Sequence, residues 1–197
     1  MKTFTTKTKL AAMVASAAAL TGAATALTGA ASAHGAAAAP NLDARVVSLG
    51  HVRGFWAADC PIAFDDATAW AQGDGAEASA LHGEGFAVGV REMLRSTSGA
   101  GGVSVALRFH SASGAAADLK RRELQAGHEG YATSFAVPDA PSVHAYTVRT
   151  NGTSTVHVAF TRGADEYAVA VETSNSADVG ALEAALGAVV RTEARHG

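Results

Sequence analysis

The sequence predicts an α+β fold, a mostly antiparallel sheet that ends in a three-strand meander, with helices packed on the sheet. Residues 142–160 form two alternating runs that meet at Asn151-Gly152, and residues 167–171 alternate in the same way. Asn-Gly between alternating runs is the strongest short-range hairpin signal. Residues 176–195 carry apolar side chains at helical spacing. Antiparallel runs interrupted by helices are typical of α+β domains.

The first 33 residues have the pattern of a signal peptide. A basic start is followed by an apolar, alanine-rich run and by an A-x-A cleavage site at residues 31–33. We therefore expect a secreted, extracellular protein, with residues 34–41 as a flexible lead-in and residues 42–197 as a single α+β domain. Nothing after the leader offers the ~18 consecutive apolar residues of a membrane helix, so we expect no transmembrane segment in the mature chain.

The charge balance argues against nucleic acid as a partner. The chain has 15 basic and 18 acidic side chains, and three of the lysines belong to the leader. The mature chain would therefore carry a formal net charge of −6, three below the −3 of the whole chain. Its one basic run is Lys120-Arg121-Arg122, whereas contacts with phosphates need clustered lysine and arginine. We interpret this run as the solvated side of a helix.

The first elements of the domain are predicted to be short. Residues 45–49 form a strand candidate, and Phe55-Trp56 supplies large apolar surface that we assign to the core. Two short helices are expected over residues 67–72 and 76–82: Asp65 or Asp66 can cap the first, Gly73-Asp74-Gly75 ends it, and Gly83-Glu84-Gly85 ends the second.

Two longer strands and a helix follow. Residues 86–94 and 103–110 alternate with period two and are expected to pair with each other. A helix is predicted over residues 113–125, with Ser113 as its N-cap, and a short strand over residues 131–137. The apolar face of that helix is expected to consist of Ala116, Leu119 and Ala126 or Leu124.

The hairpin turn sets the register and the two faces of the meander. Around a two-residue turn Tyr146 faces His157 and His144 faces Ala159. Side chains alternate along a strand, so one face of the hairpin is apolar and the other polar. The apolar face consists of Val143, Ala145, Val156, Val158 and Phe160. The polar face consists of His144, Tyr146, Thr155 and His157. We expect the closing helix to pack on the apolar face.

Five stretches resemble a group of exported actinobacterial proteins, many of them lipoproteins of unknown function, some of which are similar to the Mog1/PsbP-like α/β/α sandwich. The stretches are residues 81–86, 107–112, 135–141, 158–163 and 167–169. The resemblance covers roughly residues 80–192 and implies an exported domain with no catalytic residues to carry across. The lipidation cysteine of many such proteins is absent here, which puts membrane anchoring in doubt.

Histidines are the candidate metal ligands. His144 and His157 are diagonal neighbours on the polar face of the hairpin, roughly 5–8 Å apart at Cβ. His110 lies on the polar face of its own strand, and three converging imidazoles would suit Zn²⁺ or Cu²⁺. The alternative is that all three are exposed or helix-covered sheet residues. His34 would become the mature N-terminus, where an amine and an imidazole can grip copper, an arrangement similar to the first ligand of copper-dependent oxygenases and copper carriers.

Cys60 is the only cysteine, which excludes a disulfide within the chain. In an exported protein a single cysteine is a buried thiol, an intermolecular bridge or a reactive site. We expect a buried, inert thiol, because unpaired cysteine behaves mostly as a small hydrophobic residue. A Cys60-linked dimer is the alternative.

The sequence carries no G-x-S-x-G, H-E-x-x-H or P-loop motif. The acidic pair Asp65-Asp66 is more typical of a helix cap than of a catalytic site. We therefore expect a secreted, non-enzymatic binding module without a cofactor, whose ligand is a cell-envelope component, a protein partner or a small molecule. The alternatives are a copper or zinc protein that uses His34 or the His110/His144/His157 set, and a hydrolase assembled from scattered aspartate, histidine and serine.

Overall fold

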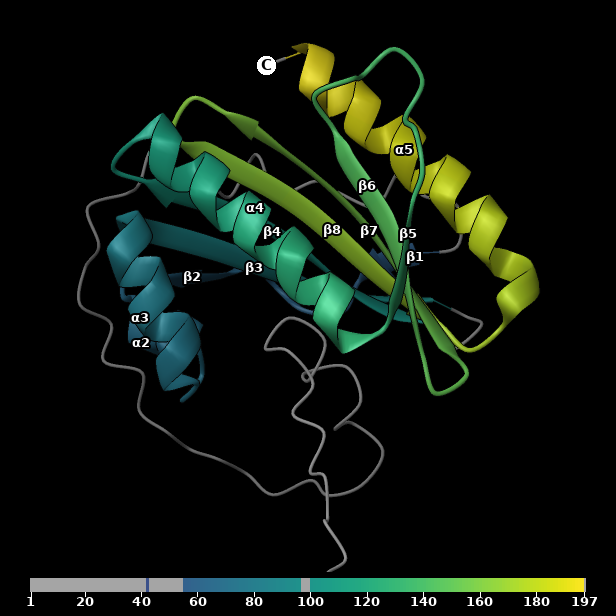
Figure 1. Cartoon of the computed structure of the whole chain (residues 1–197), viewed down its shortest axis with the longest axis horizontal. Coiled ribbons are helices and arrows are strands. Elements are labelled where there is room, and N and C mark those ends of the chain that lie inside the picture. Colours follow the sequence, from purple (N-terminus) through teal and green to yellow (C-terminus); the bar gives the residue numbers. More distant parts are fainter. Residues whose placement is uncertain (1–41, 43–54, 97–99, 197) are drawn as a thin grey trace, which may run out of the picture.

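The fold is organised by one antiparallel sheet. The computed structural model describes residue 42, residues 55–96 and residues 100–196, with side chains as far as residue 192. Within these residues eight strands form a single sheet in the order β1-β3-β4-β8-β7-β6-β5, with β2 also paired to β3. Figure 1 shows this sheet with helices packed on it. The α+β prediction is confirmed, while the strand expected over 45–49 lies outside the described residues.

The strands are β1 (Phe55–Ala57), β2 (Ile62–Phe64), β3 (Phe86–Ser96), β4 (Gly101–Phe109), β5 (Tyr131–Ser134), β6 (His144–Thr150), β7 (Thr153–Arg162) and β8 (Asp165–Thr173). The helices are α2 (Ala67–Trp70), α3 (Gly75–Glu84), α4 (Ala112–Glu129) and α5 (Val179–His196), with a 3₁₀ turn, η3 (Ser176–Asp178), before α5. No helix within the described residues is long and apolar enough to cross a membrane.

The predicted hairpin is present with the predicted register. β6 and β7 meet at Asn151 (φ 50°) and Gly152 (φ 83°), and both positive φ angles are those that a type I′ turn requires. Tyr146 lies opposite His157, and His144 lies opposite Ala159. β7 then pairs with β8 from Ser154 to Arg162, which completes the three-strand meander.

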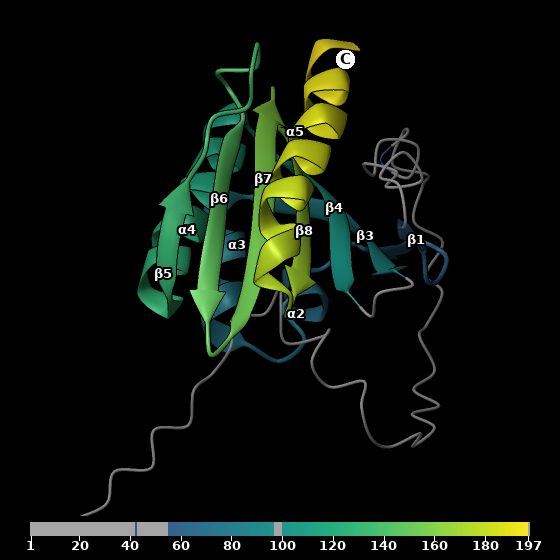
Figure 2. The same cartoon turned by 90° about the vertical axis from the view of Figure 1, so that its right-hand side faces the viewer.

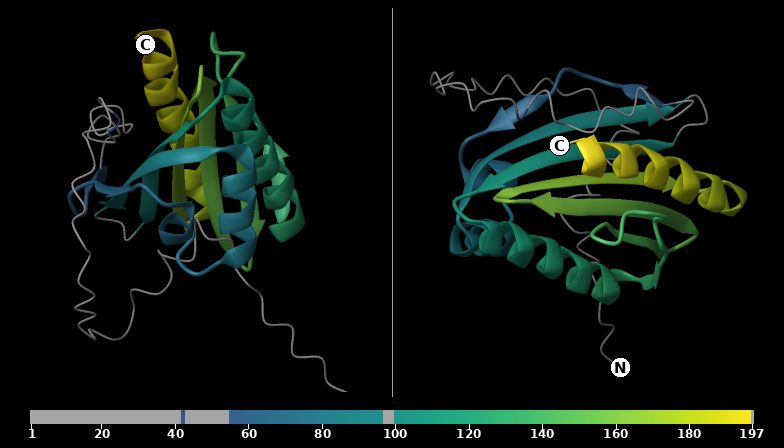
Figure 3. Two further views of the ribbon diagram at one scale, coloured as in Figure 1. Left: turned by 90° about the vertical axis from the view of Figure 1, so that its left-hand side faces the viewer. Right: turned by 90° about the horizontal axis from the view of Figure 1, so that it is seen from above.

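The two faces of the sheet are covered by different helices. Figure 2 shows α5 across β7 and β8 with α4 behind the sheet, and the view from above in Figure 3 shows the strands between the two helices. On the α5 side the apolar face of the hairpin meets the helical stripe of Leu182, Leu186 and Val190, as predicted. On the α4 side a second apolar cluster includes Trp70, Leu107 and Ala115. The polar face of the hairpin therefore lies under a helix.

The β1–β2 edge differs from the prediction. Both short strands pair with β3, and the turn between them carries Cys60. The thiol of Cys60 is exposed, so the prediction of a buried cysteine is wrong. Trp56 is 45% exposed rather than part of the core. Phe55 of β1 and Phe64 of β2 do pack against the apolar clusters, Phe64 on Trp70 of α2, whereas Trp56 lies on the exposed side of the edge.

Candidate functional site

Helix α4 carries charged residues on the face that it turns to the sheet. Its N-cap is Ser111, whose hydroxyl accepts a hydrogen bond from the backbone N–H of Gly114 at 3.0 Å, two residues before the predicted cap. The carboxyl of Asp118 is fully buried, and Leu119 beside it is buried as well. Arg122, one turn after Asp118, has a side chain only 12% exposed. The prediction that Arg121 and Arg122 are solvated is therefore wrong.

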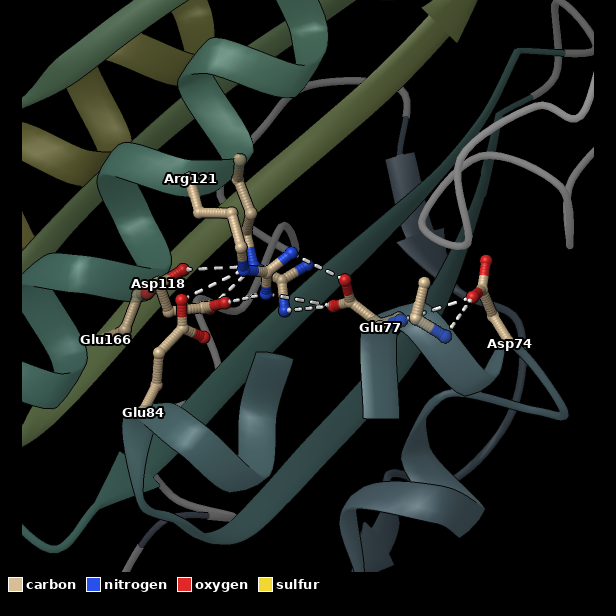
Figure 4. Close-up of polar contacts among 8 residues, drawn as sticks. Asp74, Glu77, Glu84, Asp118, Arg121 and Glu166 are labelled. Atoms are coloured by element: carbon tan, nitrogen blue, oxygen red, sulfur yellow. Dashed lines mark hydrogen bonds and ion pairs between the residues drawn. The ribbon is translucent and has the colours of Figure 1, made fainter. Parts of the chain in front are cut away.

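Arg121 joins α4 to α3. Its guanidinium lies 2.6 Å from Oε2 of Glu77 and 2.9 Å from Oε1 of Glu84, and it also contacts Asp118 of its own helix. Figure 4 shows this guanidinium among the carboxylates of α3 and α4. Asp74 caps α3 by accepting hydrogen bonds from the backbone N–H groups of residues 76 and 77, which fixes the turn that presents Glu77.

Arg122 is more buried than Arg121 and lies close to three carboxyl groups. Its Nε donates to Oδ2 of Asp118 at 2.6 Å, its Nη2 lies 3.1 Å from Oε1 of Glu77, and its Nε lies 3.8 Å from Oε1 of Glu166. Burial by itself would lower the pKa of Arg122, but the surrounding carboxyl groups, Asp118 above all, outweigh burial and raise it. Arg122 is therefore a permanent cation under α4.

Glu166, which β8 places on the α4 side of the sheet, lacks a full counter-charge. It is completely buried, and as a carboxylate neither of its oxygens has a hydrogen-bond partner among the described residues, whereas in the protonated form it hydrogen-bonds to Asp118. Burial raises its pKa well above the ordinary range, and the negative charge of Asp118 raises it further. For Asp118, burial opposes ionisation, but the charges of Arg122 and Arg121 outweigh it and lower the pKa. Asp118 is thus the ionised member of the pair and Glu166 the protonated one.

These side chains form a charge cluster, and its charges do not balance. Its members are Glu77, Glu84, Asp118, Arg121, Arg122 and Glu166. Four carboxyls face two guanidinium groups, so full ionisation would leave two uncompensated negative charges. Burial also raises the pKa of Glu84. Because buried charge is costly unless it is paired, the cluster holds protons where counter-ions are lacking.

A pocket adjoins the cluster between α4 and the sheet, here called the α4 pocket. Its interior measures about 20 Å³, which is room for about one water molecule. Its polar lining consists of Arg122, Tyr146, His157 and Glu166. The remaining lining is apolar and includes Leu119 of α4 and Ala168 of β8. The pocket therefore joins an apolar wall to one end of the charge cluster.

Two stacked rings form one side of the α4 pocket. Tyr146 and His157 are opposite each other on β6 and β7, with ring centroids 4.8 Å apart and an angle of 14° between the planes. Burial lowers the pKa of His157 to about 4, and the positive charge of Arg122 acts in the same direction. Burial raises the pKa of the Tyr146 phenol. Both rings are therefore neutral near pH 7.

The histidines proposed as metal ligands occupy different places. His157 lines the pocket, whereas His144 is exposed and its Nδ1 lies 3.2 Å from Oε2 of Glu123 on α4. The register across the sheet places His144 level with Val105 of β4, so His110 lies five residues along and three strands across. That separation is about 20 Å from standard strand spacings. Within the described residues, no three histidine, cysteine, aspartate or glutamate side chains are grouped to hold a metal.

His34 lies outside the described residues. The copper and zinc hypothesis therefore stays a prediction.

Sequence reasoning missed the charge cluster, although two signals pointed to it. Asp118 and Arg122 are four residues apart, the spacing that places an ion pair on one helical face. Glu166 shares its face of β8 with Ala168 and Ala170 at period two, a small apolar face that a helix can approach closely. Both signals are local, whereas the partners on α3 are some 40 residues away from Arg121 in the sequence.

Comparison with known proteins finds a likeness among solved structures but no family. No protein-family model matches the chain, and no curated protein matches it. A solved structure with a similar arrangement is the extracellular domain of PknH from Mycobacterium tuberculosis, with a TM-score of 0.48 and 10% sequence identity. The match covers 73% of this chain and 86% of that one. A likeness of this size carries no argument about function, so the resemblance to exported actinobacterial proteins stays a prediction.

Proposed function

We propose that this protein is an exported binding module that takes a group of a small ligand into the α4 pocket. The observation that carries the proposal is Glu166, a completely buried carboxyl at the pocket wall whose oxygens, when ionised, have no hydrogen-bond partner among the described residues. Buried polar groups in folded proteins are paired, so an ionised Glu166 would need a water, ion or ligand in the pocket as its partner. Export rests on the leader pattern of residues 1–33.

The chemistry of the pocket supports binding rather than catalysis. A general base works best with a pKa near the operating pH, and an imidazole whose pKa is about 4 is a poor base at neutral pH. The lining of the α4 pocket contains no serine, threonine or cysteine that would serve as a nucleophile. The stacked rings and the apolar wall instead offer contact area for a ligand.

Native mass spectrometry of the protein recovered from culture medium tests the proposal. We expect the wild-type protein to carry a small non-covalent ligand. Ala168→Leu would fill the pocket without changing its charge, so the ligand should be lost. Ala116→Leu is the matched control, because Ala116 lies on the exposed side of α4 and the ligand should be retained.

Equal retention by the Ala168→Leu variant, or a wild-type protein without a ligand, would refute the pocket as a ligand site. The same spectrum tests the other expectations from the sequence. A mass that begins at His34 and includes copper or zinc would favour the metal protein. A co-purifying protein would favour partner binding, and a doubled mass that reducing agent abolishes would identify a Cys60-linked dimer.

A further inference from the structure

The charge cluster is short of positive charge at the point where it meets the α4 pocket. Arg121 contacts Glu77, Glu84 and Asp118, so its positive charge is already balanced by these carboxylates. Arg122 makes its short contact with Asp118 and lies 3.8 Å from Glu166. One guanidinium group cannot neutralise both carboxylates, and Arg122 lies closer to Asp118 than to Glu166. Glu166, when ionised, is therefore the carboxylate without a full counter-charge.

Size and lining of the pocket restrict what that counter-charge is. A space of about 20 Å³ accepts a group as large as a water molecule, which is also the size of an ammonium group. Within the described residues no side chains are grouped as a metal site, which leaves a hydrogen-bonding cation as the better match. Neutral imidazole and phenol rings provide acceptor atoms and π faces for such a cation.

An anion fits this place less well. With Glu166 protonated, three carboxylates still face two guanidinium groups, so an added anion would enter a region of net negative charge. A neutral ligand would leave Glu166 protonated and the balance unchanged. A cation would supply the positive charge that the cluster lacks.

We propose that the α4 pocket binds the ammonium group of a small primary amine such as methylammonium, with the carboxylate of Glu166 as its counter-ion. The inference rests on the proposed function, since it names the ligand class of the same pocket. In the unliganded protein Glu166 keeps its proton. Binding of the ammonium releases this proton to solvent, so that one positive charge replaces another and the charge of the cluster is unchanged.

Charged and titratable groups on four elements face Glu166 or its immediate surroundings. They are Asp118, Arg121 and Arg122 on α4, Glu77 and Glu84 on α3, His157 on β7 and Tyr146 on β6. Among the groups that line the pocket, Glu166 is the carboxyl whose ionisation would change on binding. Affinity for the cation should therefore weaken about tenfold for each pH unit below the pKa of Glu166.

The test is a titration followed by NMR of the wild-type protein with ¹³C-labelled glutamate. The probes are methylammonium chloride and methanol, which match in size and differ in charge, with tetramethylammonium chloride holding the ionic strength constant. We expect methylammonium to shift the Glu166 carboxyl signal to that of an ionised carboxylate and to release up to one proton per site. Methanol should cause no such shift at the same concentrations.

Two variants assign the effect to Glu166. Glu166→Gln keeps the shape of the side chain without a charge and should weaken methylammonium binding at least tenfold. Glu123→Gln removes an exposed carboxyl of α4 and should leave binding unchanged. If Glu166→Gln does not fold, the wild-type carboxyl signal alone decides.

Two outcomes separate failure of the inference from failure of the proposed function. Methanol that binds as tightly as methylammonium, or a Glu166 signal that never ionises while a neutral ligand is bound, overturns the cationic ligand and keeps the pocket. Absence of a response to either probe, together with a ligand-free wild-type mass, overturns both.

Discussion

Replacement of Arg122 by methionine should destabilise the fold strongly. The change keeps much of the side-chain volume but leaves Asp118 and Glu166 under α4 without their shared cation, and Arg122 itself is only 12% exposed. Removal of one partner from a buried ion pair costs about 3–5 kcal/mol. With a urea m-value of about 2 kcal/mol/M, the midpoint of unfolding should fall by about 2 M.

The loss of stability should depend on pH, and the direction of this dependence follows from the titration of Asp118. In the wild-type protein the pKa of Asp118 is lowered, so its contribution to stability is present above the unfolded pKa and disappears as the pH falls through the folded one. In the Arg122→Met variant burial is offset only by Arg121, so the pKa of Asp118 should rise. The destabilisation should then be largest near pH 7 and shrink towards about pH 4 as Asp118 is protonated.

The assay is urea unfolding followed by circular dichroism at several pH values. Lys120→Met is the control, because Lys120 is an exposed residue of the same helix and its removal should change stability by less than about 0.5 kcal/mol. The double variant Asp118→Asn/Arg122→Met should recover part of the loss, since it no longer buries an unpaired aspartate. A loss below about 1 kcal/mol for Arg122→Met, or one independent of pH, would refute the reasoning.

Three further predictions concern other parts of the molecule. Gly114→Ala should lower the free energy of unfolding in urea by about 1–3 kcal/mol, because a Cβ there would overlap the backbone carbonyl oxygen of Glu84. Gly127→Ala is the control: it has open space around it and should raise the free energy of unfolding by up to about 1 kcal/mol. Equal effects of the two substitutions would contradict this reasoning. The pKa of His157 is about 4 in the folded protein and about 6.5 in the unfolded chain. The contribution of His157 should therefore lower the free energy of unfolding by at most about 3 kcal/mol as the pH falls from 6.5 to 4. The His157→Phe variant should show a smaller fall in the same unfolding assay. Cys60 should react with a thiol reagent in the native protein about as fast as after unfolding, and a reaction that needs denaturant would show that the thiol is covered.

The hairpin and the closing helix were predictable because their signals are local. The positive φ angles that Asn151 and Gly152 tolerate select the turn, and the turn determines which residues of β6 and β7 face each other. The apolar stripe that includes Leu182 and Leu186 needs an apolar surface, and the hairpin offers one. Each step depends on residues that are close in sequence or on one contact between adjacent elements.

The inner face of α4 was not predictable in the same way. Hydrophobic periodicity assigns arginine to water, and Leu119 with a few alanines is too sparse a stripe to orient a helix unambiguously. In the structure Ala115 is buried and Leu124 is exposed, so the helix is rotated from the expected position. The rotation places Arg122 over β8, where Glu166 can face it.

By itself the sequence determined the α+β class, the order of most elements in the described part of the chain, the register of the hairpin and the two faces of the meander. These features follow from turn chemistry and from period-two or period-3.6 patterns, which any short stretch of chain reveals. Only the tertiary structure decided that charged side chains lie beneath α4, that His157 and Tyr146 close a pocket there, and that Cys60 is exposed. The physical reason is that the burial of a charge depends on partners from distant segments, and a carboxyl such as Glu166 acquires its altered pKa only when β8, α3 and α4 come together.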